Sequence, residues 1–238
     1  MNNKKIIWAL FDSETSITLG LESHKYKVIT IGIATDSSKT KDFININLSK
    51  KSCIRKLRNL DKPDIIFASP PCETWVGLSI GNIRFFNRNY NEYNLYWQRN
   101  FKGNDFTKKL REKRLEGQRT AYWTAEIIKT FKPELWVIEN GRSSLIFQYL
   151  RTYFNMNGYK NNTYYSAYDK SFSPKPTIFY SNKKFFLKNY INRTGRTIEN
   201  KGKGFDCIIS YANRSRVPLG IYKDILKQYE GYGQQYLF

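Results

Sequence analysis

The sequence has few cysteines, few acidic residues and no long apolar run. Its three cysteines, Cys53, Cys72 and Cys207, are an odd number without metal-type spacing. This argues against a disulfide framework or a metal site and fits a reducing cytoplasm. No stretch approaches the roughly 20 apolar residues that span a bilayer. The basic start leads into only a short apolar run, so we expect neither a signal peptide nor a membrane segment.

Acidic residues are scarce beside basic ones: 40 Lys and Arg face 20 Asp and Glu, and the formal net charge is +20. A field of this sign and size favours a polyanionic partner, and nucleic acid is the commonest one. AT-rich coding would raise the lysine content but would not explain the small number of acids. An anionic membrane surface is the weaker alternative, because no basic amphipathic helix stands out.

Short apolar runs rich in β-branched residues recur between helical stretches, at 6–11, 27–33, 65–68 and 135–138. Strands that alternate with helices predict an α/β fold with a mainly parallel sheet covered by helices on both faces. In such sheets ligands bind beyond the carboxyl ends of the strands. We therefore expect functional residues directly after three of these runs, the first, third and fourth.

The remaining pattern predicts two helices and one unusual insert. Helical spacing appears over 120–131, with Ala121, Ala125 and Ile128 on one face, and again over 217–229. A strand-like run occupies 178–180. The insert at 77–116 interleaves cations with aromatic residues, as a surface that tracks a nucleic-acid backbone and stacks on bases would. A long loop with a small core of its own is the equal alternative.

One motif follows the third apolar run: Ser69-Pro70-Pro71-Cys72. Two prolines end the strand and stiffen its exit, which holds Cys72 beyond the carboxyl end of the sheet. Alone, such a thiol is as often inert. The fourth run, however, ends in Glu139-Asn140 and places a carboxyl at the same edge. A thiol and a carboxyl suit thiolate addition to C6 of cytosine, assisted at N3 by a carboxyl whose proton affinity is raised by burial.

These two motifs, in this order, resemble those of DNA cytosine-5 methyltransferases. The likeness is greatest to small phage-type members with Ser-Pro-Pro-Cys-Glu-(Ser/Thr)-Trp and Ile-Glu-Asn motifs, and it covers about residues 5 to 228. It implies a Rossmann-like S-adenosylmethionine-dependent methyltransferase fold that methylates C5 of a flipped cytosine. It also implies that Cys72 is the nucleophile, that Glu139 contacts N3 and the exocyclic amine, and that Asn140 helps to hold the loop.

By the same resemblance, S-adenosylmethionine would lie against the first strands, the Pro-Pro turn and a late motif. The expected cofactor-binding residues are Phe11, Asp12, Ser13, Glu14, Thr15, Asp36, Asn45, Ser69, Pro70 and Ser215. The sequence departs from the family in two places here. The usual glycine-rich turn after the first strand is absent, and Gly32 stands where an acidic residue is expected. Asp36 follows four residues later, and a solvated loop aspartate is an equal interpretation of it.

The family's large target-recognition region and its Gln-x-Arg-x-Arg segment are missing, and Lys175 falls in the corresponding region. We expect the insert at 77–116 and the basic stretch at 183–206 to share DNA recognition. The candidate nucleic-acid contacts are Arg84, Arg88, Arg99 and Lys175.

The expected organisation is a catalytic and cofactor-binding core over 1–160, a small target-recognition-like region over 161–212 and a helix returning to the core over 213–238. The expected partner is double-stranded DNA, bound by a cytoplasmic monomer, with a paired restriction endonuclease as a further expectation. Three alternatives stay open. They are methylation of cytosine N4 or adenine N6, a catalytically weak DNA-binding protein with this fold, and an RNA substrate.

Overall fold

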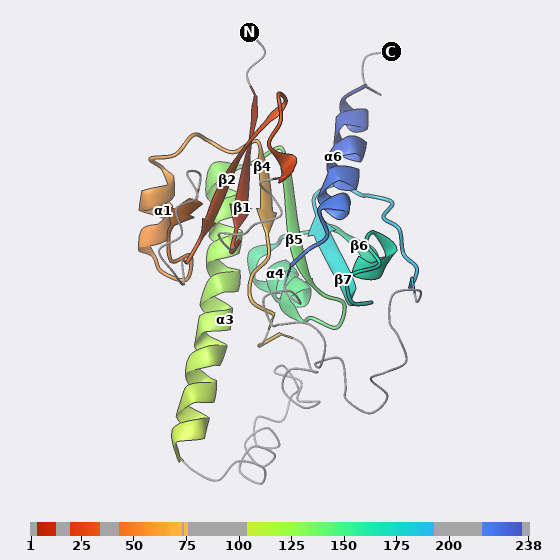
Figure 1. The fold of residues 1–238 in the computed structure, drawn as a ribbon. Helices are drawn as coiled ribbons and strands as arrows, with labels where there is room; N and C mark the ends of the chain where they lie inside the picture. Colours follow the sequence, from red (N-terminus) through yellow and green to blue (C-terminus); the bar gives the residue numbers. More distant parts are fainter. Residues whose placement is uncertain are drawn as a thin grey trace.

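A seven-stranded sheet organises the part of the chain that the computed structural model describes (Figure 1). That part comprises residues 4–12, 20–33, 43–72, 74–75, 104–192 and 216–234. The strands run in the order β3-β2-β1-β4-β5-β7-β6. Their bounds are β1 Lys5–Leu10, β2 Tyr26–Gly32, β3 Phe43–Asn45, β4 Ile65–Ala68, β5 Leu135–Gly141, β6 Tyr159–Tyr164 and β7 Pro176–Ser181.

Strands β1 to β5 are all parallel, whereas β7 runs antiparallel to both of its neighbours, β5 and β6. The order β3-β2-β1-β4-β5 is the one that Rossmann-type sheets adopt. The expected α/β, Rossmann-like architecture with a mainly parallel sheet is therefore confirmed. The helices are α1 Ser52–Leu57, α3 Asn104–Phe131, α4 Ile146–Phe154 and α6 Leu219–Gln234, with the short 3-10 helix η3 Tyr165–Ala167.

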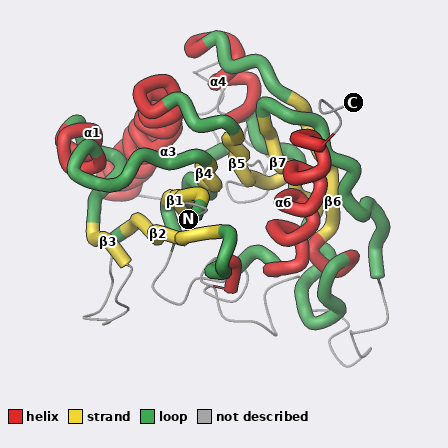
Figure 2. Tube along the Cα trace, turned by 90° about the horizontal axis from the view of Figure 1, so that it is seen from above, coloured by secondary structure: helices red, strands yellow, loops and turns green. Residues whose placement is uncertain are grey.

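Helices cover both faces of the sheet (Figure 2). Successive side chains of a strand point to opposite faces, so Trp8 and Ile66 pack against α1, α3 and α4. Ile7 and Phe67 lie on the other face and pack against α6. This double burial explains why the strands read as continuous apolar runs. Within the described helices, none is long and apolar enough to cross a membrane.

Strands β3 and β6 were not predicted from the sequence, and β5 and α3 differ from the prediction in their bounds. Strand β5 continues to Gly141, so Glu139 and Asn140 lie inside it, because β7 supplies backbone partners at Phe179 and Ile178. Helix α3 begins at Asn104 and not near residue 120. The loop interpretation is therefore wrong for residues 104–116. Their many Lys, Arg and Glu residues are good helix formers, but this stretch lacks the apolar stripe by which a helix is recognised in a sequence.

The expected boundary at residue 160 falls inside β6, and both β6 and β7 belong to the same sheet as β1 to β5. The expected C-terminal helix corresponds to α6, and its residues Tyr222, Ile225 and Leu226 are buried against the sheet.

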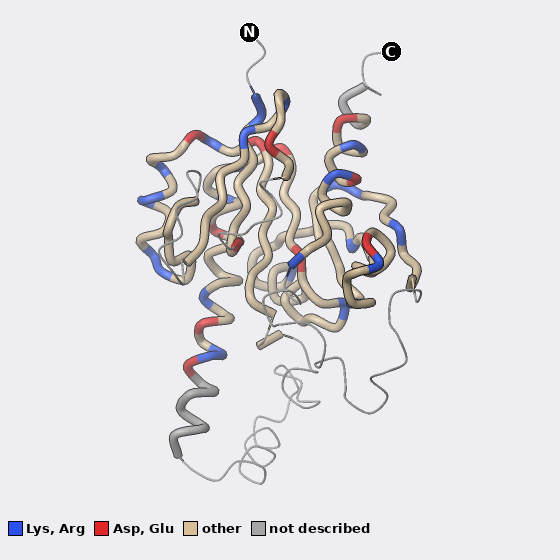
Figure 3. Tube along the Cα trace, in the orientation of Figure 1, with Lys and Arg blue, Asp and Glu red and all other residues tan. Residues whose placement is uncertain are grey.

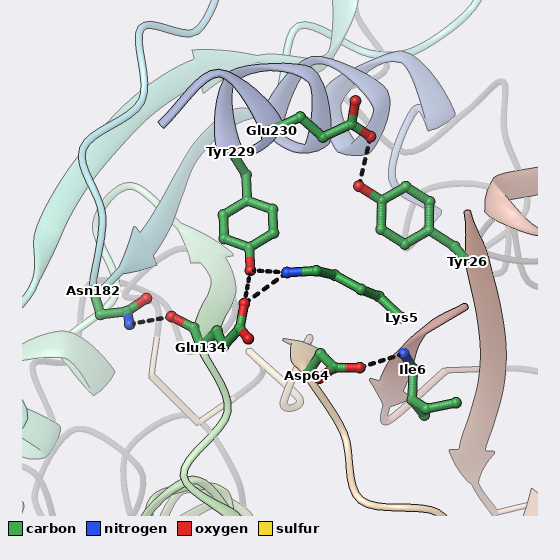
Figure 4. A network of polar contacts seen from close by, with 8 residues as sticks. All are labelled: Lys5, Ile6, Tyr26, Asp64, Glu134, Asn182, Tyr229 and Glu230. Atoms are coloured by element: carbon green, nitrogen blue, oxygen red, sulfur yellow. Dashed lines mark hydrogen bonds and ion pairs between the residues drawn. The ribbon is translucent and has the colours of Figure 1, made fainter. Parts of the chain in front are cut away.

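A polar network ties α6 to the amino ends of the strands (Figure 4). Lys5 Nζ lies 2.7 Å from Glu134 Oε2 and 2.9 Å from the hydroxyl of Tyr229, which also donates to Glu134. The hydroxyl of Tyr26 donates to Glu230 at 2.7 Å. The figure also shows the contacts of Ile6, Asp64 and Asn182. The amino edge of the sheet is thus fastened by side chains from β1, β2 and the start of β5.

Candidate active site

The turn after β4 carries Cys72 and is braced on both sides. The amide of Ser69 donates to the carbonyl of Leu10 at 3.1 Å, which ties the turn to the end of β1. The amide of Trp75 donates to the carbonyl of Cys72 at 2.9 Å, and that of Leu145 donates to the carbonyl of Trp75 at 3.1 Å. Trp75 is buried, while Cys72 is partly exposed. The turn therefore holds a reachable thiol in a fixed place.

Helix α3 supports this turn at very close range. A Cβ atom built on Gly117 would lie 1.8 Å from Oγ1 of Thr74 and 2.9 Å from its Cβ. Any side chain at residue 117 would therefore push against the residues that follow Cys72. Glycine is used here for the approach of a helix to a loop, not for an unusual backbone angle.

Glu139 lies in β5 with only 6% of its surface exposed. Its Oε1 accepts a hydrogen bond from the hydroxyl of Tyr165 at 2.7 Å and another from Lys175 Nζ at 3.3 Å. Tyr165 opens η3 and is 1% exposed. Burial and then the charge of Glu139 raise the pKa of Tyr165 well above its ordinary value, so its hydroxyl stays a donor.

Lys175 lies beside Glu139. Burial lowers the pKa of this lysine, but the charges of Glu139 and Cys72 outweigh burial, and its pKa is raised above 10.5. The ammonium group also lies 5.0 Å from the ring centre of Tyr165. The lysine side chain is 26% exposed and that of Glu139 is 8% exposed. The carboxyl of Glu139 and the ammonium group of Lys175 therefore form a shielded pair.

Asn140 links the two strand ends that carry this chemistry. It is fully buried, its Nδ2 donates to the carbonyl of Pro70 at 3.0 Å, and its Oδ1 accepts from the amide of Gly141 at 3.1 Å. This crosslink fastens the Pro-Pro turn to β5. Cys72 and Glu139 thus lie close to the ends of two neighbouring strands, at the carboxyl edge of the sheet.

Tyr222 of α6 lies buried beneath the same edge. Burial raises its pKa far above 10.0, the charges of Asp12 and Glu139 raise it further, and the hydroxyl of Ser69 lowers it. Its ring lies 4.7 Å from that of Phe67 in β4. Helix α6 therefore reaches the ends of β1, β4 and β5 from its own face of the sheet, which is opposite to the face that α1, α3 and α4 cover.

The backbone after β1 is unusual. Phe11 has a φ of 61°, a left-handed conformation that non-glycine residues adopt rarely. A Cβ atom on Gly32 would lie 2.3 Å from the carbonyl oxygen of Asp12. Gly32 is thus needed for this approach, which explains why no acidic residue occupies its place. Beyond it, Ile33 is 57% exposed, and the exposed Asn45 pairs with Gly32 at the end of β3.

Several expected residues fall outside the described part of the chain. They are the cofactor candidates Ser13, Glu14, Thr15, Asp36 and Ser215 and the DNA contacts Arg84, Arg88 and Arg99. Within the described part, no group of three or more His, Cys, Asp or Glu residues could hold a metal ion.

No family model and no curated protein matches the sequence. Among solved structures, the chain is similar to a protein described as a candidate DNA modification methyltransferase encoded within an Escherichia coli prophage. The two are 13% identical with a TM-score of 0.42, over 75% of this chain and 46% of the other. The chain therefore spans less than half the length of that protein. A likeness of this size does not decide function, which has to be inferred from the site.

Sequence reasoning missed two tyrosines of the site. Tyr165 and Tyr222 lie 26 and 83 positions beyond Glu139 in the chain, as their residue numbers show. Only the pairing of β5 with β7 and the packing of α6 bring them to it. Their one signal in the sequence is a tyrosine, with its polar hydroxyl, within an otherwise apolar run. Ordinary core tyrosines have the same appearance. Lys175 stays a predicted DNA contact, and sequence reasoning missed that its Nζ also donates to Glu139.

Proposed function

We propose that the protein is an S-adenosylmethionine-dependent DNA cytosine-5 methyltransferase with Cys72 as its nucleophile. One observation carries the proposal: a braced, partly exposed thiol follows β4, and a buried carboxyl lies near the end of the neighbouring parallel strand β5, at the carboxyl edge of a Rossmann-like sheet. Thiols add to carbon as thiolates, and a nearby cation favours the thiolate. A carboxyl group can bind the N3 and amino edge of cytosine.

The net charge of +20 supports a DNA substrate. Basic residues appear on α1, on α3 and on the segment after β7 (Figure 3). Helix α3 also extends beyond the carboxyl edge of the sheet, where the Cys72 turn lies (Figure 1). Polyanionic DNA would therefore meet positive charge on both sides of the proposed site.

The proposed reaction starts with a cytosine that has left the base stack. The sulfur of Cys72 bonds to C6, the C5–C6 π pair moves to C4–C5, and the C4–N3 π pair moves to N3. N3 takes up a proton beside Glu139, and C5 becomes the nucleophile that accepts the methyl group. Methyl transfer would release S-adenosylhomocysteine, and N3 gives back its proton as the N3–C4 double bond forms again. Solvent then takes the C5 proton, and the freed electron pair restores the C5–C6 double bond and expels Cys72 as a thiolate.

S-adenosylmethionine would supply the electrophilic methyl group when bound. The described residues at the ends of the first strands fit such a ligand. The left-handed turn at Phe11 bends the chain sharply beyond β1, and the exposed Ile33 offers apolar surface to an adenine ring. Phe11, Asp12, Asn45 and the Ser69-Pro70 turn would hold the ligand at this edge. These residues and Cys72 all lie beyond or near the carboxyl ends of parallel strands, where nucleotides bind in such sheets.

Methyl transfer to DNA tests this proposal. The protein is incubated with labelled S-adenosylmethionine and duplex DNA, and the methylated nucleoside is identified after digestion. 5-Methylcytosine is the expected product. N4-Methylcytosine or N6-methyladenine would contradict the assignment in favour of an amino-methyltransferase. DNA binding without cofactor binding would instead indicate a catalytically weak binding protein, and methylation of RNA alone would exclude the DNA substrate.

Covalent trapping tests the nucleophile directly. On duplex DNA that contains 5-fluorocytosine, elimination is blocked because C5 carries no removable proton. In the presence of S-adenosylmethionine, the native protein should methylate C5 and then remain in a denaturation-resistant adduct that maps to Cys72 by mass spectrometry. The Cys72→Ser variant should form none, while Cys207→Ser serves as the control that keeps the adduct.

A further inference from the structure

Arg142 directly follows β5, at the same edge of the sheet as Glu139. Its backbone is fixed there, because its amide donates to the carbonyl of Pro176, the first residue of β7, at 3.0 Å. Glu139 precedes Arg142 by three positions in the sequence, which is about 10 Å along an extended chain. A ligand bound at the carboxyl of Glu139 would therefore have Arg142 at its side.

The guanidinium group of Arg142 is held by two neighbouring side chains. Its Nη1 donates to the hydroxyl of Tyr164 at 3.0 Å, and its Nη2 donates to Oδ1 of Asn189 at 3.0 Å. The guanidinium carbon also lies 4.5 Å from the centre of the Tyr164 ring, which is a cation–π distance. Tyr165, the next residue, donates to Glu139. Two adjacent tyrosines therefore orient a guanidinium group and a carboxylate at one edge of the sheet.

The charge of Arg142 is not neutralised within the part of the chain that the structure describes. Both of its side-chain acceptors are neutral, and it forms no ion pair with a described carboxylate. Its Nε is buried without a hydrogen-bond partner, so the fold satisfies this guanidinium group only in part. The carboxylate of Glu139, by contrast, is paired with Lys175. Because arginine stays protonated in proteins, Arg142 keeps its full charge for a ligand.

A second cation lies on the segment that holds Arg142. Lys188 immediately precedes Asn189, its side chain is exposed, and no ion pair joins it to a described acidic residue. Its backbone is fixed, because its amide donates to the hydroxyl of Tyr168 at 3.0 Å and its carbonyl accepts from Oγ1 of Thr163 at 2.7 Å. The segment beside Arg142 thus adds positive charge and supplies no acidic partner.

We propose that Arg142 binds a phosphate group of the DNA strand beside the extruded cytosine. The phosphodiester is the anion that DNA would bring to this edge, and guanidinium groups bind phosphate oxygens through paired N–H donors. The inference deepens the proposed function and rests on it for the DNA substrate. The nucleotide is then held at two points, with its base against Glu139 and its backbone against Arg142.

A salt titration of DNA binding tests this role without cofactor or methyl transfer. The affinities of native protein and Arg142→Gln for one fluorescent duplex are measured by anisotropy over a series of salt concentrations. Loss of one phosphate contact should lower the slope of log K against log salt by about 0.9, which is about an eightfold loss of affinity at about 0.1 M salt. Duplexes of different sequence should show the same loss, because phosphates carry no base information.

Two charge variants provide the controls. Lys62→Gln removes one exposed charge just before the amino end of β4, at the opposite edge of the sheet, and should leave the slope unchanged. Arg142→Lys keeps the charge and should keep most of the slope, although it loses the paired donors. A thermal melt shows whether each variant is folded. If Arg142→Gln is not, Arg142→Met repeats the test with a side chain that can still pack on the ring of Tyr164.

Equal slopes for native protein and Arg142→Gln would overturn the inference, even if the variant bound DNA more weakly. A merely structural role changes the affinity but not the number of phosphates contacted. A slope that falls equally in Lys62→Gln would also overturn it, because the effect would then not belong to this edge.

The same data separate this inference from the proposed function. Methylation of C5 by native protein, together with equal slopes, would contradict only the role of Arg142. A slope that falls in Arg142→Gln, in a protein that yields no 5-methylcytosine, would contradict only the proposed function. A native protein that binds no duplex at low salt would contradict both.

Discussion

The two edges of the sheet carry the same three residue types in different surroundings. At the amino edge Lys5, Glu134 and Tyr229 contact one another, and the lysine and glutamate side chains are 43% and 58% exposed. At the carboxyl edge Lys175, Glu139 and Tyr165 repeat the set, with the lysine and glutamate 26% and 8% exposed. In both trios the ammonium also lies over the tyrosine ring, at 4.9 Å and 5.0 Å from its centre.

The comparison shows that position in the fold, not residue type, distinguishes a structural polar network from a reactive site. Solvent screens the amino-edge trio, and such pairs add little to stability. The carboxyl-edge trio is shielded, so its charges act strongly on one another and on a neighbouring thiol. Cys72 lies on the turn after β4, at the same carboxyl edge as this second trio.

The largest expected effect is a loss of methyl transfer, and it follows from a change at the carboxyl edge. Replacing Cys72 with Ser should lower methyl transfer by about 10³-fold or more, because a hydroxyl replaces the attacking thiolate. Thermal unfolding should change little, since the side chain is partly exposed. Activity close to the native rate with C72S would exclude a covalent role for this residue.

The two glutamates form a matched pair for the second prediction. Glu139→Gln should lower kcat by about 10²- to 10⁴-fold, the usual range when a proton-transfer group is removed. Glu134→Gln breaks the amino-edge trio and should leave kcat unchanged. Steady-state rates on one DNA substrate compare them. Equal losses in both variants would mean that the two trios do not differ in function.

The two tyrosines sharpen the comparison through stability. Tyr165→Phe removes a buried hydrogen bond to a carboxylate and should cost about 1.5–3 kcal/mol. Tyr229→Phe acts on the partly exposed trio and should cost less than about 1 kcal/mol. Urea denaturation at neutral pH gives both values. A larger loss for Tyr229→Phe would reverse the assignment of the amino edge as the weaker trio.

The smallest expected effect is the pH dependence of the amino-edge trio. Hydrogen bonds from Lys5 and Tyr229 lower the pKa of Glu134, so its contribution is present above 4.5 and is lost as pH falls through the lowered pKa. Burial lowers the pKa of Lys5, but the bonds to Glu134 and Tyr229 outweigh it and raise the pKa. That contribution is present below 10.5 and is lost as pH rises through the raised pKa.

The Lys5→Met variant measures this contribution by comparison with native protein. The difference in unfolding free energy between the two should be small near neutral pH and should shrink toward both acid and alkaline extremes. A difference that grows toward either extreme would show that the pairing of Lys5 with Glu134 does not stabilise the fold.

The sequence alone was sufficient for the parallel strands β1, β2, β4 and β5 and for the edge that carries Cys72 and Glu139, whereas the three-residue strand β3 was not predicted. Buried parallel strands are continuous apolar runs, so they can be located in the sequence. Because ligands bind beyond the carboxyl ends of such strands, the candidate residues can be located as well. The direction of β7 could not be predicted, because a run such as Ile178–Tyr180 has the same appearance in either direction. The pairing that extends β5 to Gly141 was missed for that reason, as was the contact of Lys175 with Glu139.

The reversal of β7 also has a consequence for how this site can be varied. The segment between β6 and β7 leaves and returns at one edge, and its base is closed where the amide of Tyr165 donates to the carbonyl of Lys175 at 3.4 Å. This closed segment can be lengthened with a loss of loop-closure entropy that costs only about 0.6 kcal/mol for each doubling of its length. The exposed residues 169–171 are therefore the part of this segment through which a new substrate preference could be grafted, while Tyr165 and Lys175 at its base stay unchanged.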